Sequence, residues 1–329
     1  MIPRKMRIVC NDADSPRTTL RRDGNDAPAA AATTDDREML MPAEHKNRFL
    51  SSEVPPRPCD QVRFHVIPVP YEATVSYAGG TARGPEAILE ASDQLELFDG
   101  TSFPGEGGIF TQSPVDCSGS PEEVMEKVKH AVLTALDADA MPVVLGGEHS
   151  LTYGEMAAFK ERFGRFGVIQ FDAHADLRDS YEGSIWSHAC VMRRAVKDLD
   201  LPLVQLGNRI FCREELEARK KYGVISWDAP YLCRHGIPEN LIPETFPQNV
   251  FITFDVDGLD PSIMPETGTP VPGGLDWYLA IDLAARAMKG RTLIGFDVVE
   301  LAPREGHIRS DFTAASLTYA LMGLAERNG

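Results

Sequence analysis

The fold expected for this chain is set by the stretch Phe166-Gly167-Val168-Ile169-Gln170-Phe171-Asp172-Ala173-His174-Ala175-Asp176. Its first six residues are largely apolar, which is typical of a parallel strand that is buried on both faces. Asp172 and His174 stand two residues apart, so their side chains would leave the same face of a strand. Asp176 follows where the strand should open into a loop. Unpaired carboxylates at a buried sheet edge are costly unless a positive charge lies among them.

Strands and helices are expected to alternate on both sides of this stretch. The pattern predicts strands at 64–69, 142–145, 203–206, 224–227, 250–254 and 292–296, and helices at 121–137, 189–199, 213–221, 277–288 and 312–327, with a further helix from Pro85. Thr152 and Glu155 have the spacing of a capping box at the start of another helix. The alternation predicts an α/β fold, a three-layer α/β/α domain with a central parallel sheet.

The composition narrows the classes of partner. The formal net charge of -16 argues against a nucleic-acid partner and agrees with cationic ligands, metal ions or solubility alone. The six cysteines form no Cys-x-x-Cys pair, which favours free thiols in a reducing compartment. No run approaches the roughly 18 apolar residues of a membrane span, and no apolar stretch follows the basic start to form a secretory signal. These features predict a cytoplasmic protein with no membrane partner.

The first 60 residues differ from the remainder. Ala27 to Ala32 is nearly pure alanine, flanked by polar and proline-rich sequence without helical or strand periodicity. We expect residues 1–60 to form a disordered N-terminal extension and residues 61–329 to form one catalytic domain.

Ligand-type residues recur where the predicted strands end. His149 follows one strand, the group from Asp172 to Asp176 follows the next, Asp255 and Asp257 follow a third, and Glu300 closes a fourth. Ligands of open parallel sheets bind at this edge. A purely structural interpretation is that these acids cap helices and pair with arginines. The recurrence of ligand-type residues at the ends of separate strands favours a metal site instead.

The number and type of these ligands favour two metal ions. Two histidines and four aspartates exceed the needs of one tetrahedral zinc, and oxygen-rich sets favour manganese. Two ions about 3.5–4 Å apart, bridged by carboxylates, could activate one water.

Three motifs resemble the signatures of the ureohydrolases, the arginase/agmatinase family: Gly-Gly-Glu-His-Ser at 146–150, Asp-Ala-His-Ala-Asp at 172–176 and Phe-Asp-Val-Asp-Gly-Leu-Asp-Pro at 254–261. The resemblance runs from about residue 63 to the C-terminus. It implies an arginase-like fold, a homo-oligomer (trimer or hexamer) and two Mn²⁺ per subunit. One ion would be bound by His149, Asp172, Asp176 and Asp255, and the other by His174, Asp172, Asp255 and Asp257.

The resemblance also implies the reaction, hydrolysis of a guanidinium to urea and an amine. Asp176 would accept a hydrogen bond from the attacking water, and Glu300 would pair with the guanidinium through charge-assisted hydrogen bonds. His188 matches the proton-shuttling histidine of the family, although it could also be a polar residue at a helix N-terminus. Asp260 is expected to form a turn.

The substrate expected first is agmatine, which would yield putrescine for polyamine biosynthesis. Asp179, Ser180 and Glu182 could receive its distal ammonium, with Arg178 paired to Asp179 at the surface. If Arg178 pointed inward, it would favour a carboxylate-bearing substrate such as 4-guanidinobutyrate. The same motifs would also fit arginine or a formimino compound as the substrate, or a non-catalytic regulator of the same fold that binds polyamines.

Overall fold

The computed structural model describes residues 47–328, and its centre is an eight-stranded sheet in which all neighbouring strands are parallel. The order across the sheet is β2-β1-β3-β8-β7-β4-β5-β6. The strands are β1 (Phe64–Val69), β2 (Ile109–Thr111), β3 (Met141–Gly146), β4 (Gly167–Phe171), β5 (Leu203–Leu206), β6 (Ile225–Trp227), β7 (Asn249–Asp255) and β8 (Thr292–Val299). The predicted strands are present, and the short edge strand β2 is an addition that the sequence analysis missed.

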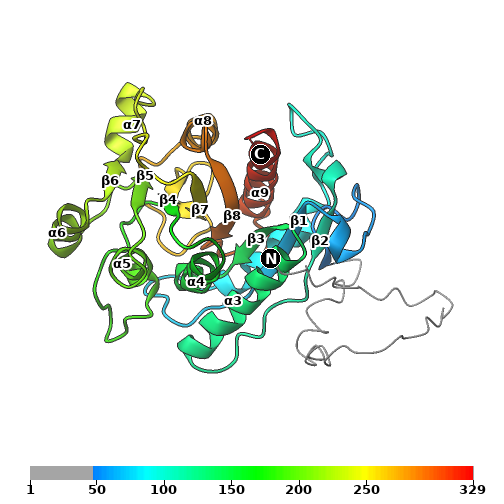
Figure 1. Cartoon of the computed structure of the whole chain (residues 1–329), viewed down its shortest axis with the longest axis horizontal. Helices are drawn as coiled ribbons and strands as arrows, with labels where there is room; N and C mark the ends of the chain where they lie inside the picture. The colour runs from blue at the N-terminus through cyan, green and yellow to red at the C-terminus, as the bar shows by residue number, and fades with distance from the viewer. Residues whose placement is uncertain (1–46, 329) are drawn as a thin grey trace, which may run out of the picture.

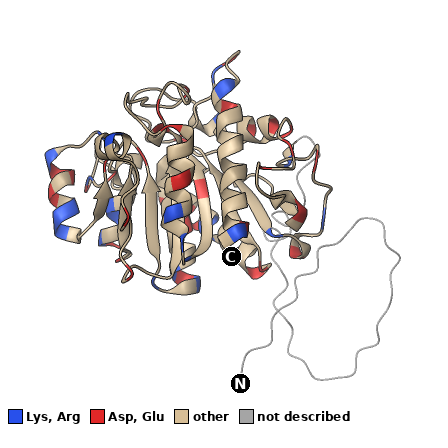
Figure 2. Ribbon diagram, turned by 90° about the horizontal axis from the view of Figure 1, so that it is seen from above, with Lys and Arg blue, Asp and Glu red and all other residues tan. Residues whose placement is uncertain are grey.

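Helices cover both faces of the sheet, which confirms the predicted three-layer α/β/α architecture (Figure 1). One face carries α2 (Gly84–Ser92), α7 (Ala229–His235), α8 (Trp277–Met288) and α9 (Arg309–Asn328). The other face carries α3 (Pro121–Asp137), α4 (Thr152–Phe163), α5 (Val191–Lys197) and α6 (Arg213–Tyr222). Lys, Arg, Asp and Glu lie mostly on these helices and on the loops (Figure 2).

The central strands are apolar on both faces because each face packs against a helical layer. In β4, Ile169 and Phe171 contribute to the core on one side of the sheet and Val168 to the core on the other side. The rings of Phe171 and Phe254 stack across β4 and β7 at a centroid distance of 4.7 Å. This two-sided burial explains why the strand reads as a continuous apolar run.

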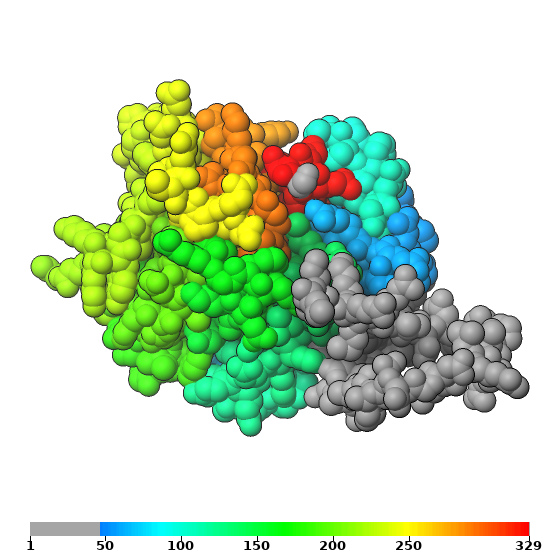
Figure 3. All heavy atoms as spheres, in the orientation of Figure 1, coloured from blue at the N-terminus to red at the C-terminus, as the bar shows by residue number. Residues whose placement is uncertain are grey.

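The expectation of a disordered extension is wrong between residues 47 and 60. Phe49, Leu50 and Val54 are buried, and the ring of Phe49 lies 6.4 Å from that of Tyr319 in α9. Figure 3 shows this early part of the chain beside the C-terminal helix. The segment packs because its apolar side chains contact distant elements of the fold. Their irregular spacing gives no helical or strand periodicity, so the sequence analysis missed them. Residues 1–46 lie outside the described residues.

One smaller expectation also changes. Thr152 does not cap α4, because a short turn at His149–Leu151 precedes the helix and the Thr152 hydroxyl donates to Asp297. Cys117, Cys190, Cys212 and Cys233 are free thiols as expected. Within residues 47–328, none of the helices combines the length and the apolar character that crossing a membrane requires.

Candidate metal centre and active-site cavity

The ligand-type residues lie at the carboxyl ends of four strands that are direct neighbours, β3, β8, β7 and β4. His149 follows β3, Glu300 follows β8, and Asp255 ends β7. The residues after β4 supply Asp172, His174 and Asp176. The strand order therefore gathers side chains that are up to about 150 positions apart in sequence.

The first group of these side chains surrounds His149. Its Nδ1 lies 3.3 Å from Asp172 Oδ2, 3.1 Å from Asp176 Oδ2 and 3.5 Å from Asp255 Oδ2. All four side chains are buried. The ring nitrogen nevertheless makes no hydrogen bond of good geometry among the described residues. Three carboxylate oxygens converging on one such nitrogen match a shared cation better than a shared proton.

The second group surrounds His174 and shares Asp172 with the first. His174 Nδ1 lies 3.5 Å from Asp172 Oδ1 and 3.0 Å from Asp257 Oδ2. The two oxygens of Asp172 thus face the two groups separately, as a bridging carboxylate would. Asp255 Oδ1 accepts the backbone N–H of Asp257 at 2.8 Å, which fixes the turn between them.

The pKa shifts show that these groups need positive charge. Burial and the charge of Asp172 raise the pKa of Asp176 to about 7. Burial also raises the pKa of Asp255 well above its ordinary value, and neighbouring carboxylates add to the shift. Burial alone would lower the pKa of His149, but the three carboxylates close to its Nδ1 raise that pKa well above 6.5. Two divalent cations would remove this conflict, so the residues present fit a binuclear metal centre.

Further polar residues hold the ligand-type side chains in place. His149 Nε2 lies 2.8 Å from the Thr253 hydroxyl, and Gln170 donates to Asp172 Oδ2 at 2.7 Å. Arg209 donates through Nη2 to the carbonyl of Asp257 at 2.7 Å. The sequence analysis gave Thr253 and Gln170 no role, since each stands inside an apolar strand without any motif of its own.

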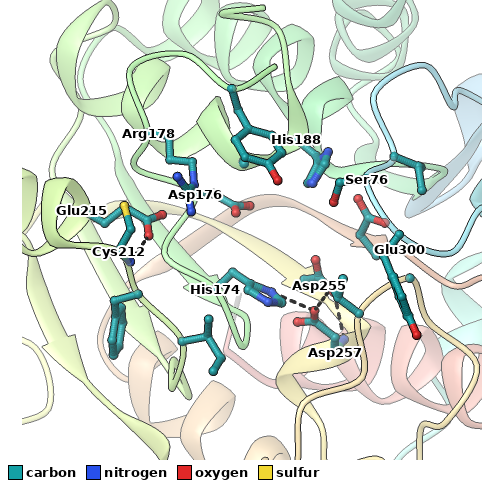
Figure 4. Close-up of a pocket in the computed structure, with 18 residues that line it drawn as sticks. Ser76, His174, Asp176, Arg178, His188, Cys212, Glu215, Asp255, Asp257 and Glu300 are labelled. Atoms are coloured by element: carbon teal, nitrogen blue, oxygen red, sulfur yellow. Dashed lines mark hydrogen bonds and ion pairs between the residues drawn. The ribbon is translucent and has the colours of Figure 1, made fainter. Parts of the chain in front are cut away.

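The two groups border a cavity of about 280 Å³ that also contains Glu300 and His188. Figure 4 shows the labelled side chains around one space, with Arg178, Cys212 and Glu215 on one side and Glu300 on the opposite side. Glu300 Oε1 accepts the N–H of His149 at 2.6 Å, and burial raises the pKa of Glu300 to about 8. Glu300 has a φ of 68°, a left-handed conformation typical of functional sites in non-glycine residues.

The far wall of the cavity differs from the expected one. Arg178 lines the cavity, and its guanidinium lies over the Tyr181 ring, so the expected surface pair with Asp179 is wrong. Asp179 instead binds Arg194 and Lys197, each at 2.7 Å. Neither Asp179 nor these two cations line the cavity.

Other residues take the place expected for the acceptors of the substrate tail. Neither Ser180 nor Glu182 is among the lining residues, whereas Glu215, at the start of α6, is. Glu215 accepts the N–H groups of Leu177 and Cys212. The sequence analysis missed this residue because only the packing of α6 beside the loop after β4 brings it to the cavity. Asp260 forms the expected turn by accepting the N–H groups of Ser262, Gly273 and Gly274.

Comparison with known proteins gives consistent matches. The profile described as Arginase family matches residues 62–323. The chain is 41% identical over 268 residues to the N(1)-aminopropylagmatine ureohydrolase of Synechocystis sp., which covers 78% of this chain and 87% of that protein. It is 31% identical over 287 residues to the agmatinase of Pyrococcus horikoshii, covering 85% and 98% of the two chains. The crystal structure of the agmatine ureohydrolase of Thermoplasma volcanium matches with a TM-score of 0.75 at 29% identity, over 85% of this chain and 94% of that chain.

Proposed function

This chain belongs to the arginase family, and its relatives include an N(1)-aminopropylagmatine ureohydrolase and an agmatinase, so we propose that it releases urea from an alkylguanidine with a positively charged tail. The first candidate for the substrate is agmatine, which would give putrescine. The observation that supports this proposal is the meeting of two ligand groups, Glu300 and His188 in one cavity. A regulator that only binds polyamines would have no need of this combination.

Two Mn²⁺ ions are proposed as the cofactors. His149, Asp172, Asp176 and Asp255 would hold one ion, and His174 and Asp257 would hold the other together with the two bridging carboxylates. When bound, the metal pair supplies a water of lowered pKa and a counter-charge for the carboxylates. Four carboxylates with two imidazoles form the oxygen-rich set that manganese prefers.

Glu300 is proposed to hold the guanidinium of the substrate. Its Oε1 is engaged by the N–H of His149, which leaves Oε2 for the substrate. A cation beside this buried carboxyl would stabilise its ionised form and form charge-assisted hydrogen bonds. Asp176, a member of the first ligand group, would accept a hydrogen bond from the attacking water.

His188 is proposed to carry a proton to the departing amine. Its side chain lines the same cavity, and burial lowers the pKa of its ring below the ordinary 6.5. A ring that is neutral near pH 7 can take up a proton and release it again.

The tail of the substrate would point toward Glu215. Glu215 and Glu300 lie on opposite sides of the cavity, so a guanidinium at one end leaves a second positive charge near the other carboxylate. Arg178 lies on the same side of the cavity as Glu215, but its guanidinium is engaged in a cation–π contact with the Tyr181 ring.

A longer substrate, N1-aminopropylagmatine, is the second candidate. Four relatives are named for that activity, three of them at 39–41% identity and one at 30%, whereas the agmatinases match at 31–33%. Its extra amine would also be positively charged and would extend the tail further from the guanidinium, beyond the first amine.

The proposal is tested by urea release from the manganese-loaded full chain with agmatine, N1-aminopropylagmatine, arginine and 4-guanidinobutyrate. We expect the two cationic-tailed compounds to have the highest kcat/KM. Binding of polyamines without urea release from any of the four compounds would contradict the enzymatic proposal and support the regulator.

A further inference from the structure

The hydroxyl of Thr74 links the buried carboxylate of Glu148 to the ring of His188. Thr74 Oγ1 lies 2.9 Å from Glu148 Oε1 and 3.2 Å from His188 Nδ1. It also accepts the backbone N–H of His188 at 3.0 Å. Glu148 belongs to the 146–150 motif, but none of the roles assigned above uses it.

The carboxylate of Glu148 acts only as an acceptor in this arrangement. Its Oε2 receives the N–H groups of Ala73 and Thr74, both at 2.6 Å, and its Oε1 receives the hydroxyls of Thr74 and Ser150. These four donors fill the acceptor sites of a carboxylate. The single hydroxyl proton of Thr74 therefore points to Glu148.

With its proton committed, the Thr74 oxygen can only accept from His188. A hydroxyl offers two acceptor sites, and the backbone N–H of His188 fills one of them. The contact to the ring is then a bond donated by Nδ1–H, which leaves the lone pair on Nε2. We infer that Glu148 is a positioning residue that acts through Thr74 to fix His188 in the tautomer with an unprotonated Nε2.

The backbone of the motif allows this contact. A Cβ at Gly147 would lie 2.0 Å from the carbonyl oxygen of Tyr71, so only glycine lets the end of β3 approach the 71–74 loop this closely. Glu148 N donates to the same carbonyl at 2.8 Å. The close approach brings Glu148 into contact with Thr74. Thr74 in turn contacts His188, which lies 114 positions further along the chain.

The tautomer matters for the proposed reaction, on which this inference rests. An unprotonated Nε2 takes up a proton from water and delivers it to the amine nitrogen, which keeps the electron pair of the broken C–N bond. The opposite tautomer presents Nε2–H to the cavity and cannot take up that proton. The tautomer set by Glu148 thus prepares His188 for the first of the two transfers.

The tautomer can be read directly by ¹H–¹⁵N correlation of the histidine rings in the full chain loaded with diamagnetic Zn²⁺. His188→Gln identifies the signal by removing it. We expect the wild-type ring to be protonated on Nδ1 and unprotonated on Nε2. Protonation on Nε2 in the wild type would overturn the inference, whether or not the protein releases urea.

Glu148→Gln should invert the tautomer. The N–H groups of Ala73 and Thr74 hold the new amide oxygen on their side, which turns the NH₂ group toward Thr74. The hydroxyl must then accept from Gln and donate to His188 Nδ1, which moves the ring proton to Nε2. An unchanged tautomer in a folded Glu148→Gln protein would contradict the inference.

Thr74 provides a matched pair of variants. Thr74→Val removes the hydroxyl at nearly constant shape, so we expect kcat to fall by about tenfold or more with little change in KM or metal content. Thr74→Ser keeps the hydroxyl and should restore both kcat and the tautomer. Thr134→Val, on the outer part of α3, controls for the substitution itself. Equal kcat in the Val and Ser variants would overturn the inference, whereas a lack of urea release by every protein, wild type included, would instead contradict the proposed function.

Discussion

The guanidinium carbon of Arg178 lies 4.9 Å from the centre of the Tyr181 ring, at the wall of the cavity. This contact holds an arginine where a carboxylate-bearing substrate could reach it. Glu215 lines the same part of the cavity with the opposite charge. The choice of substrate therefore depends on which of the two side chains meets the tail.

We expect agmatine to exceed arginine and 4-guanidinobutyrate in kcat/KM by at least about tenfold, which corresponds to about 1.4 kcal/mol. The reason is that a substrate carboxylate would approach Glu215 while Arg178 stays over Tyr181. Kinetics with the three compounds measure this preference. If 4-guanidinobutyrate is preferred and Arg178→Ala abolishes that preference, Arg178 reads the tail and the agmatinase proposal is wrong.

Asp172→Asn and Asp255→Asn are each expected to lose manganese and urea release together. Each change removes a carboxylate oxygen that lies within 3.5 Å of His149 Nδ1. Elemental analysis after dialysis gives the metal content per chain. Asp282→Asn, an exposed position of α8, is the matched control and should keep both properties. Two manganese ions per chain and normal turnover in either cavity variant would contradict the binuclear proposal.

His188→Ala is expected to lower kcat by roughly 10²–10⁴-fold, the usual contribution of general acid–base groups, while the metal content stays unchanged. The side chain lines the cavity but belongs to neither ligand group. Steady-state kinetics and elemental analysis on the same sample separate the two effects. His235→Ala makes the same change on the exposed part of α7 and should be active. An unaltered kcat would remove His188 from the mechanism.

Phe49→Ala is expected to lower the free energy of unfolding by about 3 kcal/mol, as for other buried aromatic truncations. Phe49 is 2% exposed and packs near Tyr319 of α9.

Deleting residues 1–40 should leave the Tm nearly unchanged, because the composition of that segment offers little to bury. Denaturant unfolding of Phe49→Ala and thermal unfolding of the deletion, each beside the wild type, make the two comparisons. A large loss of Tm on the deletion alone would show that the predicted extension is docked.

His65 should make the stability depend on pH between about 6.5 and 4. Burial lowers its pKa from 6.5 to about 4, although the Cys59 carbonyl opposes the shift by binding Nε2 at 2.8 Å. A depressed histidine pKa means that the unfolded chain takes up the proton first. The contribution of neutral His65 to the free energy of unfolding is therefore complete above pH 6.5 and is lost as the pH falls to 4. The loss is at most about 3 kcal/mol. The difference in unfolding free energy between wild type and His65→Gln, followed from pH 7 to pH 4, should shrink by this amount. A constant difference would contradict the assignment.

The sequence by itself determined the layers of the fold and the chemistry at the sheet edge. The run from Phe166 to Phe171 is largely apolar, which is typical of a strand between two helical layers. Asp172 directly follows such a strand, Asp255 ends another and His149 lies just beyond a third, so their approximate place could be predicted once the sheet was parallel. Local spacing is sufficient to predict a strand and the ligand-type residues at its carboxyl end, because both depend only on residues that are close together in the sequence.

Only the tertiary structure decided which distant side chains meet. Nothing near Glu215 in the sequence indicates that it lines the cavity, and nothing near Thr74 indicates that its hydroxyl contacts His188, since both contacts arise from the packing of separate segments. Arg178 lies over Tyr181 at the cavity, while Asp179 pairs with Arg194 and Lys197 of α5, a choice among charged partners from different elements. Phe49 is buried for the same kind of reason, because α9 supplies its partner from the other end of the chain. Such contacts depend on strand order and helix packing, which no local pattern of residues contains.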